Sequence, residues 1–332
     1  MFYDIIFFML RYLLLGIILF TLIIGFSFGY LILKHFPKEL PSLLLALNGK
    51  NFFFSLLSLF FYHTFDTLRV IIIARAVGIK YPLWYGYIVS FVNTFGATIT
   101  PAHIGGEILP LYTLSRKGGH LHQILTIVTM KSISGALFYL FMAPFTLKTI
   151  FENPKEAKEL LFIVLSISAF FILGYVIYKN FLKKETLLKK GLLTKFKHML
   201  LRYIVTSKIF FKTKKLHFFL AIFFSLLLYN SFLMIGIFLL KAFNPSIDPL
   251  EIFFRQLPLL YAIFVSPTPG GSGVGELGAL PIFSVYLPED LLGPFVIIWR
   301  FLSQYLSALI GGLFFLLLLM KDIKKNYVPT NI

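Results

Sequence analysis

The sequence predicts an all-α polytopic membrane protein with about six full transmembrane helices and two re-entrant hairpins in an inverted repeat. Of the 332 residues, 58% are hydrophobic and only 14% are charged, against about 25% charged in a typical soluble domain. Many of the apolar residues fall in stretches of helical membrane-spanning length. A soluble globule of this size could not bury so much apolar surface, so lipid must be part of the solvent. These observations exclude most cytosolic enzymes, nucleic-acid-binding proteins and secreted modules.

Six apolar stretches are long enough to cross the hydrocarbon core as helices, since about 20 residues suffice. They run approximately over 11–33, 52–74, 122–146, 159–178, 217–240 and 292–320. The first is too long for a signal peptide and lacks a clear small-residue cleavage site, so we interpret it as a mature helix. We expect residues 1–332 to form a single integral membrane domain.

Two further apolar stretches, near 83–99 and 251–265, are shorter, and each ends in a Pro- and Gly-rich segment. A second short apolar piece follows each, near 104–115 and 275–287. We interpret each pair as a re-entrant hairpin, because irregular backbone at membrane depth is tolerated where protein or a water-filled cavity covers it. The predicted turn residues are Pro101, Gly105, Gly106, Pro267, Pro269, Gly270, Gly271, Gly273 and Gly275.

The basic residues indicate the topology. Lys and Arg number 31 against 14 Asp and Glu, and 12 of the basic residues lie in 179–217. By the positive-inside rule this segment is cytoplasmic, which also places both termini in the cytoplasm of a multi-pass cell (plasma) membrane protein. Apolar residues recur at helical spacing in 179–217, as in an interfacial helix on anionic lipid headgroups. The alternative is a solvated basic connector that only fixes topology.

One order of features occurs twice along the chain: a helix, a basic residue, Pro-Leu, a half-helix, Thr-Pro, a Gly-rich turn, a glutamate and an intramembrane cation. Lys131 follows Glu107 by 24 residues, and Arg300 follows Glu276 by the same interval. We place repeat 1 at about 52–146 and repeat 2 at about 217–320, with opposite orientation. Secondary transporters share this plan, and their sites form where discontinuous helices meet. The alternative is chance similarity between two Pro- and Gly-rich loops.

Seven polar residues at or near membrane depth are the candidate substrate-binding residues. Each charged one costs about 2.5–3.5 kcal/mol at a helix centre, so such residues usually face a cavity and pair with one another or with a ligand. Arg and Lys also bind phosphate. Structural alternatives are helix capping by the glutamates, salt bridges that hold the hairpins and an internal ion pair. The candidates are Asp66, Arg69, His103, Glu107, Lys131, Glu276 and Arg300.

Several chemistries lack the residues that they need. The chain has no Cys, and therefore no disulfide, thiol nucleophile or thiolate metal site. The run 270–273 matches the Gly-x-Ser-Gly of intramembrane serine proteases, but no His follows His217 to act as the base. The chain also carries no His-Glu-x-x-His zinc motif. We expect no metal, no cofactor and no catalytic constellation.

The second hairpin motif carries a family resemblance. Pro267-x-Pro269-Gly-Gly-x-Gly-Val-x-Glu276, followed by Arg300, Tyr305 and Gly311-Gly312, resembles the flippase-like family, the transmembrane region of lysylphosphatidylglycerol synthases and its free-standing relatives. The likeness runs over nearly the whole chain. In the first motif, His103 and Lys131 stand where the family favours Arg.

The resemblance implies movement of a lipid between leaflets, either an aminoacylated phospholipid or a polyprenyl-phosphate-linked species. In the synthases a soluble aminoacyl-transferase domain follows this region. Here about a dozen residues follow the last span, so lipid synthesis is not expected of this chain.

The leading hypothesis is therefore a flippase-like transporter for an anionic or zwitterionic phospholipid or a polyprenyl-phosphate lipid, with membrane lipids as its partners. One alternative is a membrane accessory or enzyme of lipid-linked glycan or lipid-headgroup metabolism. Another is a small-solute secondary transporter with the same inverted repeat. The sequence has no ATP-binding loop, so gradients or mass action would drive transport. It does not indicate an oligomeric state.

Overall fold

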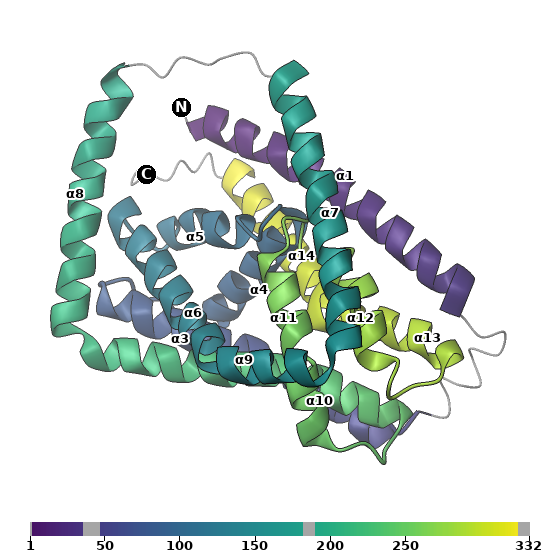
Figure 1. The fold of residues 1–332 in the computed structure, drawn as a ribbon. Coiled ribbons are helices and arrows are strands. Elements are labelled where there is room, and N and C mark those ends of the chain that lie inside the picture. Colours follow the sequence, from purple (N-terminus) through teal and green to yellow (C-terminus); the bar gives the residue numbers. More distant parts are fainter. Residues whose placement is uncertain (1, 36–46, 182–189, 325–332) are drawn as a thin grey trace.

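The computed structural model describes residues 2–35, 47–181 and 190–324, and its regular elements are helices (Figure 1). Within these ranges, five segments are long and apolar enough to cross a membrane: Gly16–Lys34, Gly49–Ala76, Leu121–Glu152, Lys215–Phe243 and Glu289–Lys324. A further helix, α7 (Pro154–Phe181), covers the predicted span near 159–178, which is not among these five. The chain is an all-α polytopic membrane protein, as the sequence predicts.

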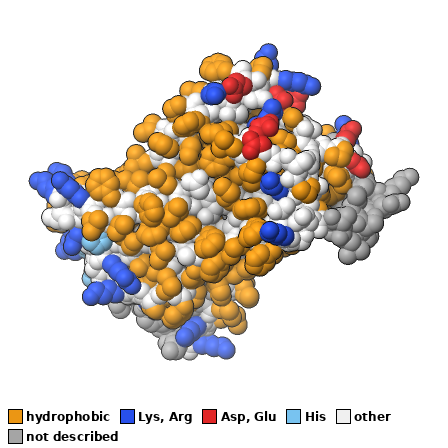
Figure 2. Space-filling model, turned by 90° about the horizontal axis from the view of Figure 1, so that it is seen from below, with side chains coloured by type: hydrophobic (Ala, Val, Ile, Leu, Met, Phe, Trp, Pro, Cys, Tyr) orange, Lys and Arg blue, Asp and Glu red, His pale blue; other side chains and the backbone are white. Residues whose placement is uncertain are grey.

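The outer surface is largely apolar. Leu33 is 89% exposed and Phe151 79% exposed, and many other large hydrophobic side chains point outward. Figure 2 shows one face on which hydrophobic side chains predominate, while the acidic side chains gather in one part of it. Apolar patches of this extent are rare on soluble monomers. They fit a surface that contacts lipid.

The first half of the chain contains one long helix, two short helices and a second long helix after the N-terminal helix α1 (Phe2–His35). These are α3 (Gly49–Ala76), α4 (Leu83–Ile99), α5 (Gly105–Ser115) and α6 (Leu121–Glu152). The short helices match the predicted half-helices near 83–99 and 104–115. Residues 100–104 between them form an irregular turn.

The second half follows the same order with more interruptions. Its elements are α9 (Lys215–Phe243), α10 (Pro249–Arg255), α11 (Leu257–Val265), α12 (Val274–Phe283), α13 (Glu289–Arg300), the π-helical turn η1 (Phe301–Tyr305) and α14 (Leu306–Lys324). The stretch near 251–265 forms two short helices rather than one. Pro258 stands at the start of α11, where a missing N–H costs least, and the buried Gln256 side chain donates to the carbonyls of Leu233 and Ile252, both at 3.3 Å.

Helices of each half pack against helices of the other half. The long helices α3 and α9 lie against each other, α4 packs on α14, and α11 packs on α6. Each first half-helix therefore contacts the closing long helix of the other half. Gly311 allows the closest approach, because a Cβ there would overlap the Phe91 backbone of α4. The buried His63 of α3 contacts α4 and α14, with ring nitrogens 2.9 Å from Ser90 Oγ and 2.7 Å from Ser307 Oγ.

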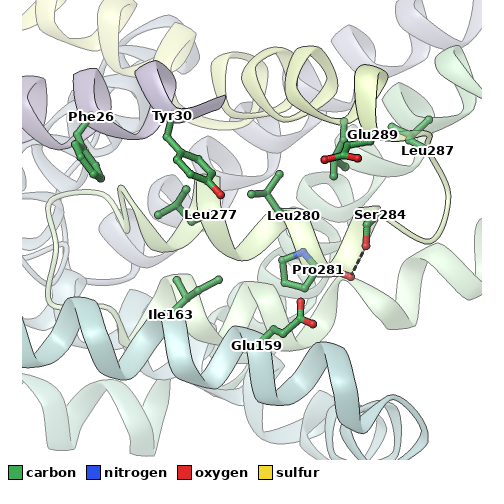
Figure 3. A pocket seen from close by; sticks show the side chains of 11 residues that line it. Phe26, Tyr30, Glu159, Ile163, Leu277, Leu280, Pro281, Ser284, Leu287 and Glu289 are labelled. Atoms are coloured by element: carbon green, nitrogen blue, oxygen red, sulfur yellow. Dashed lines mark hydrogen bonds between the residues drawn. The ribbon is translucent and has the colours of Figure 1, made fainter. Parts of the chain in front are cut away.

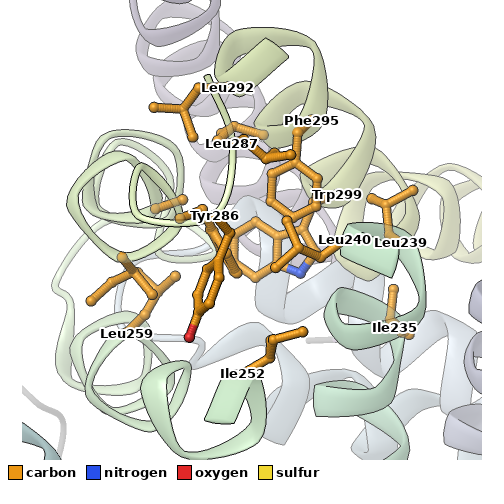
Figure 4. Packing of buried hydrophobic residues seen from close by; sticks show 14 of the residues in the cluster. Ile235, Leu239, Leu240, Ile252, Leu259, Tyr286, Leu287, Leu292, Phe295 and Trp299 are labelled. Atoms are coloured by element: carbon orange, nitrogen blue, oxygen red, sulfur yellow. The ribbon is translucent and has the colours of Figure 1, made fainter. Parts of the chain in front are cut away.

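The largest buried hydrophobic cluster lies in the second half (Figure 4). The Phe283 ring lies 4.7 Å from that of Phe295 and 5.6 Å from that of Trp299, centroid to centroid. These contacts join α12 to α13. In lipid, helix association depends on such packing more than on exclusion of water, so the cluster fixes the second broken helix firmly.

Helix α8 (Lys190–Thr213) forms within the basic segment 179–217, of which residues 182–189 lie outside the described ranges. It runs along one edge of the molecule, across the direction of α9 (Figure 1). Tyr203 and Ser207 hydroxyls contact Thr129 and Thr126 of α6, at 2.9 and 3.4 Å. Its exposed side chains include both apolar and basic residues: Leu201, Arg202, Ile204, Val205, Lys208, Ile209, Phe211 and Lys212. Interfacial placement remains a prediction.

Candidate functional site

The turns of the two broken helices meet. Pro101 and Pro269 form an isolated antiparallel bridge between them. After each Pro, two residues adopt left-handed backbone: Ala102 and His103 with φ of 51° and 59°, and Gly270 and Gly271 with φ of 60° and 64°. The same local turn thus occurs on both sides of the bridge. Only the second uses glycine, the residue that tolerates this conformation at no steric cost.

The first turn leads into a partly open ion pair. Lys131 Nζ of α6 lies 3.2 Å from Glu107 Oε1 and donates to the Gly106 carbonyl at 3.0 Å. The Glu107 side chain is 41% exposed. The start of α5 is capped by a different residue, because Thr100 Oγ1 accepts from the Gly105 N–H at 2.7 Å. Glu107 is therefore not needed as the cap that the structural alternative assigns to it.

The second turn contains a closed ion pair. Arg300 Nε lies 2.9 Å from Glu276 Oε1, and both side chains are 0% exposed. Glu276 Oε2 accepts from the Gly273 N–H at 2.5 Å, so this glutamate caps α12. Arg300 Nη2 also donates to the Gly270 carbonyl at 3.2 Å. Gly275 makes room for the guanidinium, because a Cβ there would lie 2.5 Å from its central carbon.

The π-helical turn η1 completes this second pair. Its i to i+5 hydrogen bonding brings residues five apart toward one face. Arg300 and Tyr305 stand five apart, and the Tyr305 hydroxyl donates to the same Glu276 carboxylate. Glu276 therefore accepts three hydrogen bonds and is fully buried.

A cavity of about 380 Å³ lies beside the first turn, lined by residues of α3, α4, α5, α6, α9, α11 and η1. Five of the seven predicted candidates line it: Asp66, Arg69, His103, Glu107 and Lys131. Glu276 and Arg300 do not. The structure thus separates the two glutamate–cation pairs that the sequence presents as equivalent.

Two ion pairs lie on the wall of this cavity. Arg69 Nη2 lies 2.5 Å from Asp66 Oδ1, three residues apart on one face of α3. Together with the Glu107–Lys131 pair, this gives two carboxylates and two cations, a formal charge balance of zero. Arg69 Nη1 also donates to Ser225 Oγ at 3.3 Å, which fixes the guanidinium against α9.

Several buried polar atoms on the cavity wall have no hydrogen-bond partner in the described part of the chain. They are Arg69 Nε, Asn93 Oδ1, His103 Nδ1, Glu107 Oε2 and Ser303 Oγ. Most buried polar atoms in folded proteins are paired, so each exception needs a reason. Their gathering around one cavity is typical of a site whose partner is a ligand.

Part of the cavity wall was not among the residues predicted from the sequence. Asn93, Ser303 and Gln304 are polar residues inside apolar stretches, and that signal could have been read in the same way as the charges. The aromatic wall has no such signal, because it comes from α3, α6, α9 and α11: Tyr62, Tyr139, Tyr229, Phe232 and Phe264. Aromatic residues are common throughout this chain, so their convergence depends on the fold.

A second, larger cavity of about 590 Å³ lies between α1, α7, α12 and α13. Figure 3 shows Phe26 and Tyr30 of α1 on one side of it and Ile163 and Glu159 of α7 on the other. Most of its lining is apolar, and Glu159 and Glu289 are its acidic residues. None of the seven predicted candidates lines it. In the described ranges, no group of three or more His, Asp or Glu side chains is placed to hold a metal ion.

Comparison with known proteins identifies the family of the chain. A UPF0104 membrane protein of Archaeoglobus fulgidus is 21% identical over 261 residues, which cover 74% of this chain and 80% of that protein. Residues 13–311 match the family described as the lysylphosphatidylglycerol synthase TM region. The matched range includes both broken helices, the Glu107–Lys131 and Glu276–Arg300 pairs and the residues that line the cavity beside the first turn. With its membrane-spanning helices and this match over most of its length, the chain belongs to the lysylphosphatidylglycerol synthase TM region family.

Proposed function

We propose that this multi-pass membrane protein is a flippase-like transporter that moves a phospholipid or polyprenyl-phosphate lipid between leaflets. The observation that carries the proposal is the charged cavity beside the first turn, with its unpartnered polar atoms. Charged side chains inside a membrane domain usually mark a substrate or ion path. The cavity volume of about 380 Å³ falls in the range typical of small-molecule sites, which suits a lipid headgroup while the tails stay in the bilayer.

The cations of the cavity would receive the phosphate. Lys131 offers a compact point charge, and Arg69 a planar fork with one N–H still unpartnered. Both are already paired with carboxylates, so binding exchanges one anionic partner for another. Such an exchange keeps each cation paired, while the displaced carboxylate needs water or another donor, which Glu107 can reach because its side chain is 41% exposed.

Rocking of one half against the other would expose the cavity alternately to the two leaflets. Contacts between the halves run through packed helices, the bridge at Pro101 and Pro269, and hydrogen bonds such as those of His63 to Ser307 and Arg69 to Ser225. The second broken helix, with its closed ion pair and large hydrophobic cluster, would move as a rigid body. The more exposed first turn would close over the headgroup.

The proposal also includes the topology. We place both termini in the cytoplasm and the protein in the plasma membrane. The first turns of α1 and the last turns of α14 lie toward the same end of the molecule in Figure 1. Helix α8, with its exposed apolar and basic side chains, would lie on the anionic lipid headgroups of the cytoplasmic leaflet.

We assign transport rather than catalysis to the cavity, because its charged groups form ion pairs suited to binding and release. A small-solute transporter remains the alternative that shares this geometry. The two differ in what the cavity accepts: a lipid headgroup needs contact with the bilayer. Ile104 and Ile108, close to Glu107 in the chain, and Phe264 on α11 are exposed and would border such a lateral approach.

Leaflet exchange tests the function. Purified protein is placed in liposomes with acyl-chain-labelled phospholipids, and the labelled lipid reaching the outer leaflet is measured by chemical quenching. A labelled polyprenyl phosphate is tested in parallel. The variant Lys131→Met removes the cavity cation, and Lys148→Met makes the same change at a site on α6 where the side chain is 71% exposed. We expect wild type and Lys148→Met to exchange lipid and Lys131→Met to lose most of that activity.

Two results would contradict the proposal. One is the absence of exchange with every lipid tested, the polyprenyl phosphate included. The other is full activity of a folded Lys131→Met protein, which would move the transport path away from this cavity.

A further inference from the structure

We propose that two charged clusters, one at each end of the helix bundle, gate the cavity beside the first turn from opposite sides. This rests on the proposed function, in which the two halves rock against each other, and it identifies the contacts that open. Three observations carry it: the matching composition of the two clusters, their places at opposite ends of the molecule and their partial access to water.

The first cluster, called the inner cluster, consists of Tyr112, Arg116 and Asp322. Arg116 Nη2 lies 2.7 Å from Asp322 Oδ1, and the Tyr112 hydroxyl donates to Asp322 Oδ2 at 2.5 Å. The Arg116 guanidinium also lies over the Tyr112 ring, 6.0 Å from its centroid. Tyr112 belongs to α5 and Arg116 directly follows that helix, whereas Asp322 belongs to α14. The inner cluster therefore joins the first broken helix to the closing helix of the other half.

The second cluster, called the outer cluster, consists of Glu156, Glu251, Arg255 and Tyr286. The Tyr286 hydroxyl donates to Glu251 Oε1 at 2.9 Å, and Arg255 Nε lies 3.3 Å from the same oxygen. The Arg255 guanidinium lies 5.8 Å from the centroid of the Tyr286 ring. Arg255 Nη1 also lies 3.7 Å from Glu156 Oε1, in the first turn of α7. The outer cluster therefore joins the second broken helix to the corner between α6 and α7.

The two clusters repeat one arrangement. In each, a tyrosine near the end of a broken helix donates to a carboxylate, and the arginine paired with that carboxylate lies over the tyrosine ring. Each also ties its broken helix to the far end of the other half, α14 in one case and the corner after α6 in the other. In a molecule built from two inverted halves, such a repeat indicates equivalent roles at opposite faces.

The packing of α3 on α9 gives the relative direction of the two halves. The Asn48 N–H, just before α3, donates to the Ala242 carbonyl near the end of α9 at 2.9 Å. One turn or more further along α3, Ser55 Oγ donates to the Ile235 carbonyl at 2.9 Å. Residue numbers rise along α3 as they fall along α9, so the two helices run antiparallel. The end of α3 and the end of α9 therefore lie at opposite ends of the bundle.

Each cluster lies at one of these two ends. A Cβ on Gly119, just after α5 and Arg116, would lie 2.7 Å from Ile79 Cδ1, just after α3. At the end of α9, Asn244 Nδ2 donates to the Tyr286 carbonyl at 3.3 Å. With the proposed topology, the inner cluster lies on the cytoplasmic side and the outer cluster on the opposite side.

Both clusters can open and close because water reaches them. The Arg116 and Arg255 side chains are 14% and 20% exposed, whereas Arg300 of the closed pair is 0% exposed. Charges that separate where water is present are hydrated, and ion pairs there contribute little to stability. Separating a fully buried pair leaves uncompensated charge inside the protein. The pairs suited to reversible opening are therefore those of the two clusters.

The accessibility of a single introduced cysteine tests the gates, because the chain has no Cys of its own. Ala97→Cys places a thiol on the cavity wall, and its labelling by a membrane-impermeant methanethiosulfonate is timed in right-side-out and inside-out vesicles. In that background, Asp322→Asn weakens the inner cluster and Glu251→Gln the outer one. Loss of one charge-assisted hydrogen bond shifts an equilibrium about tenfold. We expect labelling to rise about tenfold from the cytoplasmic face with Asp322→Asn and from the outer face with Glu251→Gln.

Three further variants serve as controls. Glu152→Gln breaks an exposed pair with Lys148 on α6 that belongs to neither cluster, and should leave both labelling rates unchanged. Tyr112→Phe and Tyr286→Phe keep the ring and remove only the donor hydroxyl of each cluster. Each should shift labelling about threefold, in the direction of the carboxylate variant of the same cluster. This pair keeps the test decisive if a carboxylate variant does not fold.

The face from which labelling rises separates gating from a general loss of structure. Equal increases from both faces, increases from the same face in both variants, or unchanged rates in folded variants would overturn the gates. Lipid exchange is measured on the same proteins. If wild type exchanges lipid but the labelling lacks the expected sidedness, the gates fail and the proposed function stands. If the labelling has that sidedness but no lipid is exchanged, the gates stand and the lipid substrate fails.

Discussion

The two broken helices are built alike and used differently. Both turns begin with Thr-Pro, pass through two left-handed residues and reach a glutamate that pairs with a cation 24 residues later. The second turn, 266–276, is almost entirely buried, whereas residues 101–104 and 107 of the first are exposed or partly exposed. The shared pattern therefore fixes the backbone of each turn, and the surroundings decide what its glutamate does.

The difference lies in the partners of the two carboxylates. Glu276 caps the Gly273 N–H, pairs with Arg300 and accepts from Tyr305, so its hydrogen-bonding capacity is used within the fold. In the first turn, Thr100 provides the cap and Glu107 keeps one oxygen without a partner. The carboxylate of the second turn is fully used within the fold, and that of the first turn lies on the cavity wall with one oxygen unpartnered.

The largest expected effect comes from breaking the closed pair. Glu276→Leu leaves Arg300 charged, buried and without its main partner, which should cost about 3–5 kcal/mol of the free energy of unfolding. Glu107→Leu should cost less, because Lys131 keeps its hydrogen bond to the Gly106 carbonyl and water can reach the site from the side of Glu107, whose side chain is 41% exposed. Thermal unfolding of both purified variants in one detergent measures the difference. Equal losses of stability would show that the two ion pairs contribute equally to the free energy of unfolding.

A second comparison exchanges glycine between the turns. Gly271→Ala forces a side chain into left-handed backbone, at about 1–2 kcal/mol, and its Cβ would lie 2.7 Å from Ile263 Cγ2. His103→Gly removes the same penalty from the first turn, offset by about 0.5–1 kcal/mol of backbone entropy. We expect Gly271→Ala to lower the unfolding temperature and His103→Gly to leave it equal or slightly higher.

Lipid exchange sharpens this second comparison. Folded His103→Gly protein should exchange lipid more slowly than wild type, because an imidazole on the cavity wall is lost while the backbone is kept. A drop in stability of His103→Gly as large as that of Gly271→Ala would mean that the imidazole is a structural group.

Much of the fold could be predicted from hydropathy and from the Pro- and Gly-rich breaks. The half-helix at 83–99 has the predicted bounds, and the long helices lie where apolar stretches of spanning length occur. The split between α10 and α11 and the π-helical turn η1 could not be predicted. Both depend on tertiary contacts, those of the buried Gln256 side chain and of Arg300 and Tyr305 with Glu276.

The different burial of the two turns could not be predicted from the sequence either. Helices α1 and α7 cover the second turn: a Cβ on Gly273 would meet Ile167 of α7 and Ile23 of α1. The first turn lacks such a cover and remains accessible. Local spacing identifies a glutamate and its cation, but burial depends on helices elsewhere in the chain. The sequence therefore indicates both pairs as candidates, and the packing separates them.

The smallest expected effect concerns the hydrogen bond from the Gly105 N–H to Thr100, which leaves Glu107 free of a capping role. Thr100→Val keeps the shape of the side chain but leaves the Gly105 N–H without its acceptor, at about 1 kcal/mol. Thr206→Val is the matched control, because the Thr206 hydroxyl also donates to the carbonyl four residues earlier but caps no helix start. Thermal unfolding should show a loss for Thr100→Val beyond that of the control. Lipid exchange should fall as well, since the freed N–H then competes for the Glu107 carboxylate. If Thr100→Val matches the control in both measurements, the cap does not hold Glu107 available, and the contrast between the two turns rests on burial alone.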